Sequence, residues 1–218
     1  MPPPIGRLHV LTDFHFQQRM SHAALAAAAV AGGADTIQFR QKGGTVRDRF
    51  ANLVETVAAC RAAGVACLVD DALDLALAAG ADGVHLGALD LPVATARRVA
   101  TELARPFIVG ATATTAAAAR AAESDGADYI GFGPVFPTRS KAAPASVKGV
   151  RGVAEASAAV SIPVIAIAGI TPVRVRPCLE AGAHGVAVMT AVSTAPDPEL
   201  AARAFRAEVD GWAANRSA

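Results

Sequence analysis

The chain is poor in cysteine and carries no excess of charge of either sign. Cys60, Cys67 and Cys178 are odd in number and isolated from one another, which excludes a disulfide framework and a paired-cysteine metal motif. Lys and Arg total 20 against 19 Asp and Glu, so the basic excess that binding to a nucleic-acid backbone requires is missing. We therefore expect buried thiols in a reducing compartment and no nucleic-acid partner.

Long apolar runs and a secretion signal are missing as well. The apolar stretches are rich in alanine and interrupted by glycine or charge, which excludes a membrane span. The first residues, Met1-Pro2-Pro3-Pro4, lack the basic start and apolar stretch of a signal peptide. We expect a soluble cytoplasmic protein that has no membrane partner.

A four-fold repeat organises the chain. Gly-Ala-Asp recurs at 33–35, 80–82 and 126–128, and Gly-Ala-His follows at 182–184. Each copy ends an alanine-rich helical pattern, where glycine suits a left-handed helix cap, and precedes a short apolar run. Such runs, typical of strands covered on both faces, lie at 8–11, 36–39, 65–69, 83–86, 107–109, 129–132, 164–167 and 185–188.

Helical patterns alternate with these runs. Eight β-α units predict the α/β class with a parallel sheet, and their regular length favours a closed barrel over an open, doubly wound sheet. We predict a single (β/α)8 TIM barrel that spans residues 1–218. The expected helices lie at about 21–32, 45–63, 72–79, 92–104, 114–124, 147–160, 172–181 and 198–214.

Polar residues follow the predicted strands, at the end where barrel enzymes carry their catalytic groups. Arg40 and Lys42 alternate along the second strand, so both should face the same way. Lys141, after the sixth strand, could add a third cation. Asp71 and Asp90 follow neighbouring strands and offer hard oxygen ligands, and Mg²⁺ is commonly held by one or two carboxylates with substrate phosphates. This pattern predicts a diphosphate bridged by Mg²⁺.

A second anion site is predicted after the seventh and eighth strands. Gly169 stands in a tight turn just before Pro172, and Met189-Thr190 follows the eighth strand. In many barrels the loops in these two places, with a helix N-terminus, bind phosphate through backbone N–H groups.

Each of these residues also has a simpler interpretation. Arg40 and Lys42 could be solvated charges at the rim, and Asp70 and Asp90 could be caps of the helices that follow them. Gly169 could serve only its turn. His85 lies within the fourth strand, where a packed wall residue is expected more often than a catalytic base.

Taken together, the motifs resemble the thiamine phosphate synthase family over nearly the whole chain, from Leu8 to about Val192. The residues that carry the resemblance are Gln38-Phe39-Arg40-Gln41-Lys42, Asp70-Asp71 before Leu73-Asp74-Leu75-Ala76-Leu77, Gly83-Val84-His85-Leu86-Gly87, Asp90-Leu91-Pro92, Gly131-Phe132-Gly133-Pro134-Val135-Phe136-Pro137-Thr138 with Lys141, and Pro163-Val164-Ile165-Ala166-Ile167-Ala168-Gly169-Ile170-Thr171-Pro172. The resemblance implies a transferase that joins hydroxymethylpyrimidine diphosphate to thiazole phosphate and releases pyrophosphate.

The resemblance also implies roles for individual residues. Mg²⁺ is the implied cofactor, with Asp71 and Asp90 as its ligands, and Arg40, Lys42 and Lys141 are the implied catalytic cations. Small molecules are the expected partners, and a homodimer is a candidate assembly. Residues implied for the pyrimidine diphosphate are Gln38, Arg40, Lys42, Asp70, Thr112 and Lys141, and those for the thiazole phosphate are Thr138, Arg139, Ser140, Gly169, Met189 and Thr190.

Some positions depart from the family pattern. Asp70 stands where the family usually has Asn, which places a carboxylate beside the diphosphate, and Ala168 replaces the first glycine of a Gly-Gly pair. The alternatives are a thiazole tautomerase-like paralogue, a non-catalytic ligand-binding paralogue and another phosphate-binding barrel enzyme. The tautomerase would use a histidine after the fifth strand, where this chain has Ala113-Thr114.

Overall fold

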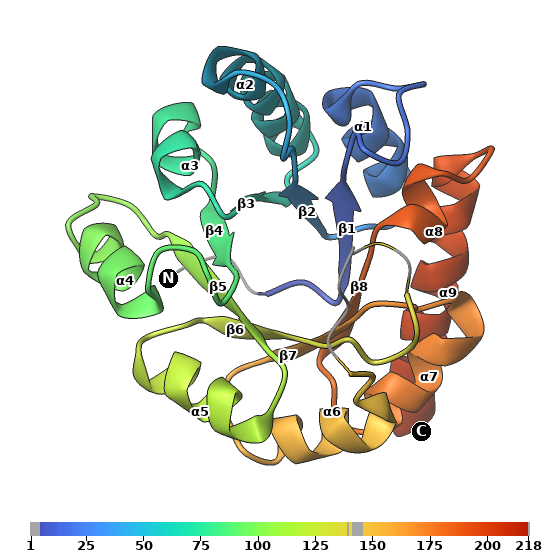
Figure 1. Ribbon diagram of the computed structural model, residues 1–218. Coiled ribbons are helices and arrows are strands. Elements are labelled where there is room, and N and C mark those ends of the chain that lie inside the picture. The colour runs from blue at the N-terminus through green and yellow to red at the C-terminus, as the bar shows by residue number, and fades with distance from the viewer. Residues whose placement is uncertain (1–4, 139, 141–145, 218) are drawn as a thin grey trace.

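Eight parallel strands form a closed barrel in the computed structural model, which describes residues 5–138, 140 and 146–217 (Figure 1). Each strand pairs with the next along the chain, and β1 also pairs with β8, which closes the ring. The predicted (β/α)8 barrel is therefore confirmed. The strands are β1 (Leu8–Thr12), β2 (Thr36–Phe39), β3 (Ala66–Asp70), β4 (Gly83–Leu86), β5 (Ile108–Ala113), β6 (Tyr129–Phe132), β7 (Val164–Ile167) and β8 (Gly185–Val188).

Helices surround the strands on the outside of the barrel (Figure 1). The segment after β8 holds two helices, because the four-residue α8 comes before the long α9. The helices are α1 (His22–Ala31), α2 (Val46–Ala62), α3 (Leu73–Ala79), α4 (Val93–Thr101), α5 (Ala116–Ser124), α6 (Gly149–Ser157), α7 (Pro172–Glu180), α8 (Thr190–Ser193) and α9 (Pro198–Ser217). Within the described ranges, no helix has both the length and the apolar character needed to span a membrane.

The repeated glycines stand where helices end. Gly33, Gly80, Gly126 and Gly182 all have positive φ, at +97°, +68°, +95° and +96°. A side chain with a Cβ is strained in this region, whereas glycine is not. The repeat thus marks the four turns that lead from a helix into β2, β4, β6 and β8.

The apolar core has two layers. One lies between the strands and the helices and holds most of the buried side chains. The other fills the barrel itself with Leu11, Leu68, Ile108, Tyr129, Ile165 and Ala187. Polar groups are buried on the strands too, since His9, Gln38 and His85 are at most 8% exposed. A barrel interior with buried polar side chains is well placed to support groups at its mouth.

The second and fifth strands differ from the prediction. Strand β2 ends at Phe39, so Arg40 and Lys42 follow the strand rather than alternate along it. Strand β5 runs to Ala113, and Thr112 therefore lies within it. Glycine and alanine are depleted in strands, but Gly110–Ala113 pair with Tyr129–Phe132 of β6, and this tertiary pairing outweighs the local preference.

Candidate functional site

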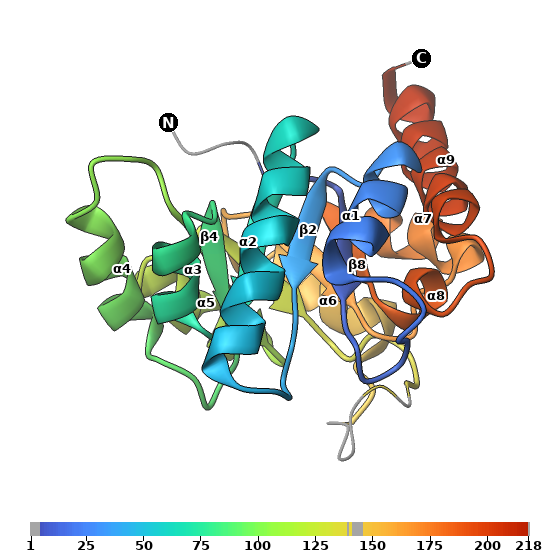
Figure 2. The ribbon, with the colours of Figure 1, turned by 90° about the horizontal axis from the view of Figure 1, so that it is seen from above.

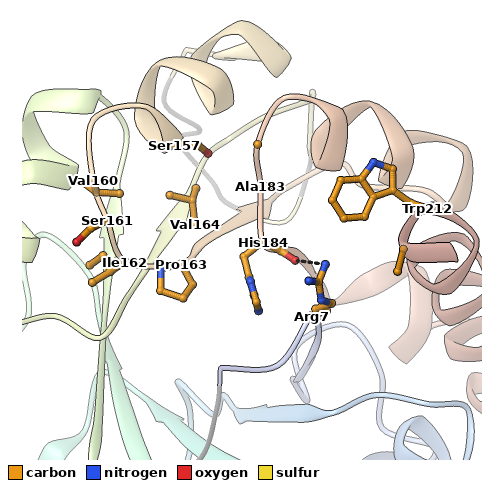
Figure 3. Close-up of a pocket in the computed structure, with 12 residues that line it drawn as sticks. Arg7, Ser157, Val160, Ser161, Ile162, Pro163, Val164, Ala183, His184 and Trp212 are labelled. Atoms are coloured by element: carbon orange, nitrogen blue, oxygen red, sulfur yellow. Dashed lines mark hydrogen bonds between the residues drawn. The ribbon is translucent and has the colours of Figure 1, made fainter. Parts of the chain in front are cut away.

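The predicted site residues lie at the carboxyl end of the barrel. In Figure 2 the arrowhead of β2 points down, so the loops that follow the strands lie along the lower edge. A cavity of about 590 Å³ opens at the opposite end, because its wall includes residues that precede β1, β7 and β8. Figure 3 shows Arg7, His184 and Trp212 on that wall. None of the predicted site residues in the described part of the chain lines this cavity.

Two cations and three carboxylates form a cluster at the ends of β1, β2 and β3. Arg40 pairs with Asp13, whose side chain is only 2% exposed, and its Nε lies 3.2 Å from Oδ2 of Asp70. Lys42 Nζ lies 3.4 Å from the same Asp70 oxygen and also pairs with Asp71. Arg40 is 17% exposed, so it is not a solvated charge at the rim.

The cluster accounts for the carboxylate at position 70. Asp70 does not cap the helix that follows, because α3 has Ala72 at its N-cap and no side-chain capping bond. Its carboxylate instead lies between the guanidinium of Arg40 and the ammonium of Lys42. Two cations offset the repulsion that one extra carboxylate would impose on an anionic ligand.

Asp13 is the residue of this cluster that was not predicted as a site residue. It follows β1 directly, and its Oδ1 accepts a hydrogen bond from the backbone N–H of His15 at 2.7 Å. That bond and its burial hold the carboxylate in place against Arg40. Its position after a strand was the available signal, but no pattern in the sequence names Arg40 as its partner.

Asp71 and Asp90, the two residues expected to hold Mg²⁺, follow the neighbouring strands β3 and β4. Asp71 has a φ of +67°, a conformation that residues other than glycine rarely adopt, and its N–H donates to the carbonyl of His85 at 2.8 Å. Asp90 does not cap α4, because its Oδ2 accepts the N–H of Gly87 at 2.7 Å and Pro92 occupies the N-cap.

The two carboxylates are of the chemical type that a magnesium ion binds. Within the described residues, no group of three or more His, Cys, Asp or Glu could hold a metal ion by itself. Mg²⁺ usually binds one or two carboxylates together with substrate phosphates and water. Asp71 and Asp90 are the carboxylates that could supply that share, and an anionic ligand would supply the rest.

The turn after β7 has an unusual backbone. Ala168 and Gly169 have φ values of +80° and +65°, and a Cβ on Gly169 would come within 2.5 Å of the carbonyl oxygen of Pro137. Arg174 donates to the carbonyl of Gly169 at 2.7 Å and lies 4.6 Å from the ring centre of Phe136. Gly169 is therefore required both by its conformation and by the close approach of the β6 loop.

The end of β8 leads directly into a helix. Met189 is the N-cap of α8, and Thr190 is its first residue. Proline opens α7 at position 172, just after the Gly169 turn. Two helices thus begin beside the ends of β7 and β8, in the arrangement common to barrel phosphate sites.

The residues predicted in the loop after β6 are only partly described by the structure. Thr138 Oγ1 accepts the N–H of Ser140 at 3.2 Å, which shapes the loop after β6. Arg139 and Lys141 lie outside the described residues, so their predicted roles stay predictions.

A chain of hydrogen bonds crosses the barrel beneath the mouth. Gln38 Nε2 donates to the Tyr129 hydroxyl at 2.8 Å, and that hydroxyl is 2.8 Å from His85 Nδ1. His85 Nε2 is in turn 2.9 Å from Thr112 Oγ1. His85 is thus more than the packed wall residue first considered, since it connects Tyr129 to a predicted substrate-binding residue.

Burial alters the acid–base behaviour of several side chains near these elements. It raises the pKa of Tyr129 well above its usual value, and the charge of Asp70 adds to the effect. It lowers the pKa of His9 from 6.5 to about 3 and that of His22 to about 4. At neutral pH these groups are an intact phenol and two neutral imidazoles.

Comparison with known proteins fits this geometry. A family model described as thiamine monophosphate synthase matches residues 8–192. The chain belongs to the thiamine monophosphate synthase family. Thiamine-phosphate synthase from Salinibacter ruber is 57% identical over 207 residues, which cover 95% of this chain and 90% of the relative. The Methanocella arvoryzae thiamine-phosphate synthase is 46% identical and covers 94% of this chain and 95% of its own length.

A solved structure within this synthase family has the same fold. Thiamine phosphate pyrophosphorylase from Pyrococcus furiosus superposes with a TM-score of 0.86 at 35% sequence identity, over 94% of this chain and 96% of that protein. The 3-hexulose-6-phosphate synthase structure shares the barrel at 21% identity and a TM-score of 0.66, which is a likeness of fold alone.

Proposed function

We propose that the chain condenses hydroxymethylpyrimidine diphosphate with thiazole phosphate to give thiamine phosphate and pyrophosphate. The observation that supports it best is the cluster in which Arg40 and Lys42 converge on Asp70 beside Asp71. Cations held at one strand end suit a diphosphate, and the thiamine-phosphate synthases named above share most of the chain with this protein.

The reaction needs stabilisation of a leaving group more than covalent help. The bond between the pyrimidine methylene carbon and the diphosphate oxygen breaks, and its electron pair leaves with the diphosphate. The thiazole nitrogen then forms the new carbon–nitrogen bond to that methylene. Arg40 and Lys42, which carboxylates already hold at this strand end, would stabilise the charge that develops on the diphosphate oxygens.

Magnesium would assist the same step. Asp71 and Asp90 would hold it, and when bound it would neutralise part of the diphosphate charge. The carboxylates of this chain would bring only part of the coordination shell, so metal and diphosphate should bind together.

The second substrate would be anchored by backbone. The turn at Gly169 and the start of α8 at Thr190 would hold the thiazole phosphate through N–H groups. Two anchored substrates at one mouth would place the thiazole nitrogen in line with the breaking bond, which would lower the entropic part of the barrier.

The test is an assay of purified protein with both substrates and Mg²⁺ that follows thiamine phosphate and pyrophosphate together. Equal amounts of the two products would support the proposal. Tight binding of both substrates without product would favour the non-catalytic paralogue. Conversion of the thiazole phosphate between tautomers, without condensation, would favour the tautomerase.

A further inference from the structure

The interior of the barrel holds a polar group that the reaction does not use directly. Tyr129 opens β6, is fully buried, and packs among the apolar side chains inside the barrel. The backbone makes room for its ring, because a Cβ at Gly110 would come within 2.2 Å of it. A buried phenol needs hydrogen-bond partners, and it has two from strands that do not neighbour each other, Gln38 on β2 and His85 on β4.

The protons of this network can be assigned from the partners. An amide nitrogen can only donate, so the Tyr129 oxygen accepts from Gln38 Nε2. The phenol keeps its own hydrogen, and among the described residues the acceptor within hydrogen-bonding distance is His85 Nδ1. His85 therefore carries its hydrogen on Nε2 and donates it to Thr112 Oγ1.

The assignment decides what Thr112 can offer a ligand. Its oxygen accepts the bond from His85, which leaves its own hydroxyl hydrogen to donate elsewhere. Thr112 is only partly buried, near the carboxyl end of β5, whereas Tyr129 behind it is fully buried. The hydroxyl hydrogen of Thr112 is therefore available to a hydrogen-bond acceptor at the mouth of the barrel.

We infer that Tyr129 is a positioning residue, which acts through His85 to present Thr112 as a donor and through Gln38 to fix a second contact with the pyrimidine substrate. This inference rests on the proposed function, in which Gln38 and Thr112 bind the pyrimidine diphosphate. The acceptor for Thr112 is then a ring nitrogen or a phosphate oxygen of that substrate. The described side-chain hydrogen bonds of Tyr129 go to Gln38 and His85, whereas Met189, the N-cap of α8, contacts its cluster through apolar packing.

The discriminating variant is Tyr129→Phe, which keeps the ring and removes the hydroxyl. We expect kcat/KM for the pyrimidine diphosphate to fall about ten-fold, and KM for the thiazole phosphate to stay the same, since one buried hydrogen-bond partner is lost on one side only. Ile165→Val is the matched control: it trims a side chain in the same interior cluster, leaves the network intact, and should keep kcat/KM within about two-fold.

A double-mutant cycle shows whether Tyr129 acts through Thr112. If it does, Thr112→Val combined with Tyr129→Phe should lose less activity than the sum of the two single losses, because only the part that acts through Gln38 is left to lose. Fully additive losses would overturn the inference. So would an increase in KM for the thiazole phosphate as large as that for the pyrimidine diphosphate.

A readout independent of turnover separates this inference from the proposed function. Nitrogen-15 NMR of the folded protein should show His85 as a neutral imidazole with its hydrogen on Nε2, and Tyr129→Phe should change that signal. A hydrogen on Nδ1 would overturn the inference even in an active enzyme. A wild-type protein that makes no thiamine phosphate but shows the expected tautomer would refute the proposed function and leave the proton assignment standing.

Discussion

Arg40 Nε lies 3.2 Å from Oδ2 of Asp70, at the point where β3 ends and the mouth of the barrel begins. The same carboxylate lies within 3.4 Å of Lys42. The two cations that would bind the diphosphate in the proposed reaction are thus partly neutralised by Asp70 in the free protein. Asp70 can hold them in position, and it also competes with the ligand for them.

Asp70→Asn tests that competition. Asparagine keeps an oxygen that can accept from Arg40 and removes the negative charge beside the diphosphate. We expect KM for the pyrimidine diphosphate to fall about three- to ten-fold, in line with the modest strength of partly exposed ion pairs. Steady-state kinetics would measure it. A higher KM would mean that Asp70 serves the ligand rather than opposing it.

Asp71→Asn tests the predicted metal ligand. Asparagine tolerates the left-handed backbone found at this position, so the variant removes charge with little added strain. We expect kcat/KM to fall about a hundred-fold at a fixed Mg²⁺ concentration. Asp74→Asn, an exposed carboxylate in the first turn of α3, is the control and should retain normal turnover.

Ala168→Gly should stabilise the protein. Alanine at φ +80° is strained by about 1–2 kcal/mol, and relief of that strain should exceed the extra chain entropy of glycine. We expect a net gain of about 0.5–1 kcal/mol in the free energy of unfolding, measured by urea titration. Ala166→Gly, two residues earlier in β7, removes a buried Cβ without relieving a positive φ and should destabilise instead.

Gly110→Ala should destabilise the barrel interior. The new Cβ would overlap the Tyr129 ring, so the ring or β5 must move, at a cost of about 2 kcal/mol or more. Thermal unfolding would detect the loss. Gly211→Ala in α9 is the contrasting case, because nothing lies within 4 Å of its Cβ and alanine suits a helix better by about 0.5–1 kcal/mol.

Acid should weaken the fold through buried histidine. The pKa of His9 is near 3 in the folded protein and 6.5 in the unfolded chain, so only the unfolded chain binds a proton as pH falls from about 6.5 toward 3. Between pH 7 and 5 this removes about 2 kcal/mol from the free energy of unfolding. His9→Gln should remove that part of the pH dependence.

Urea unfolding of the wild-type protein and of His9→Gln at pH 7 and pH 5 would measure this difference. If His9→Gln lost as much stability between the two pH values as the wild-type protein, burial of His9 would not be the source of the acid sensitivity.

Much of the fold could be predicted because its signals are local. Gly33, Gly80, Gly126 and Gly182 mark helix ends through their own backbone requirement, and the apolar runs that follow them are the strands. The extent of β5 could not be predicted, because Gly110–Ala113 has weak strand preference and pairs with a segment distant in sequence.

The candidate site, too, could be predicted only in part from the sequence. Arg40, Lys42, Asp70 and Asp71 stand just after or at the end of strands, and the barrel rule brings them together. The partnership of Asp13 with Arg40 and the link from Tyr129 to Thr112 depend on which side chains meet across the barrel. No spacing in the sequence indicates these side-chain contacts, so the structure was needed to find them.

In the proposed reaction the cation cluster holds the pyrimidine diphosphate, and a separate site holds the thiazole phosphate. The most direct test is to measure KM for each substrate in Lys42→Ala, since the 49% exposed Lys42 side chain can be removed without disturbing the core. We expect KM for the pyrimidine diphosphate to rise about ten-fold or more, while KM for the thiazole phosphate is unchanged. Equal rises for the two substrates, or a rise for the thiazole phosphate alone, would contradict it.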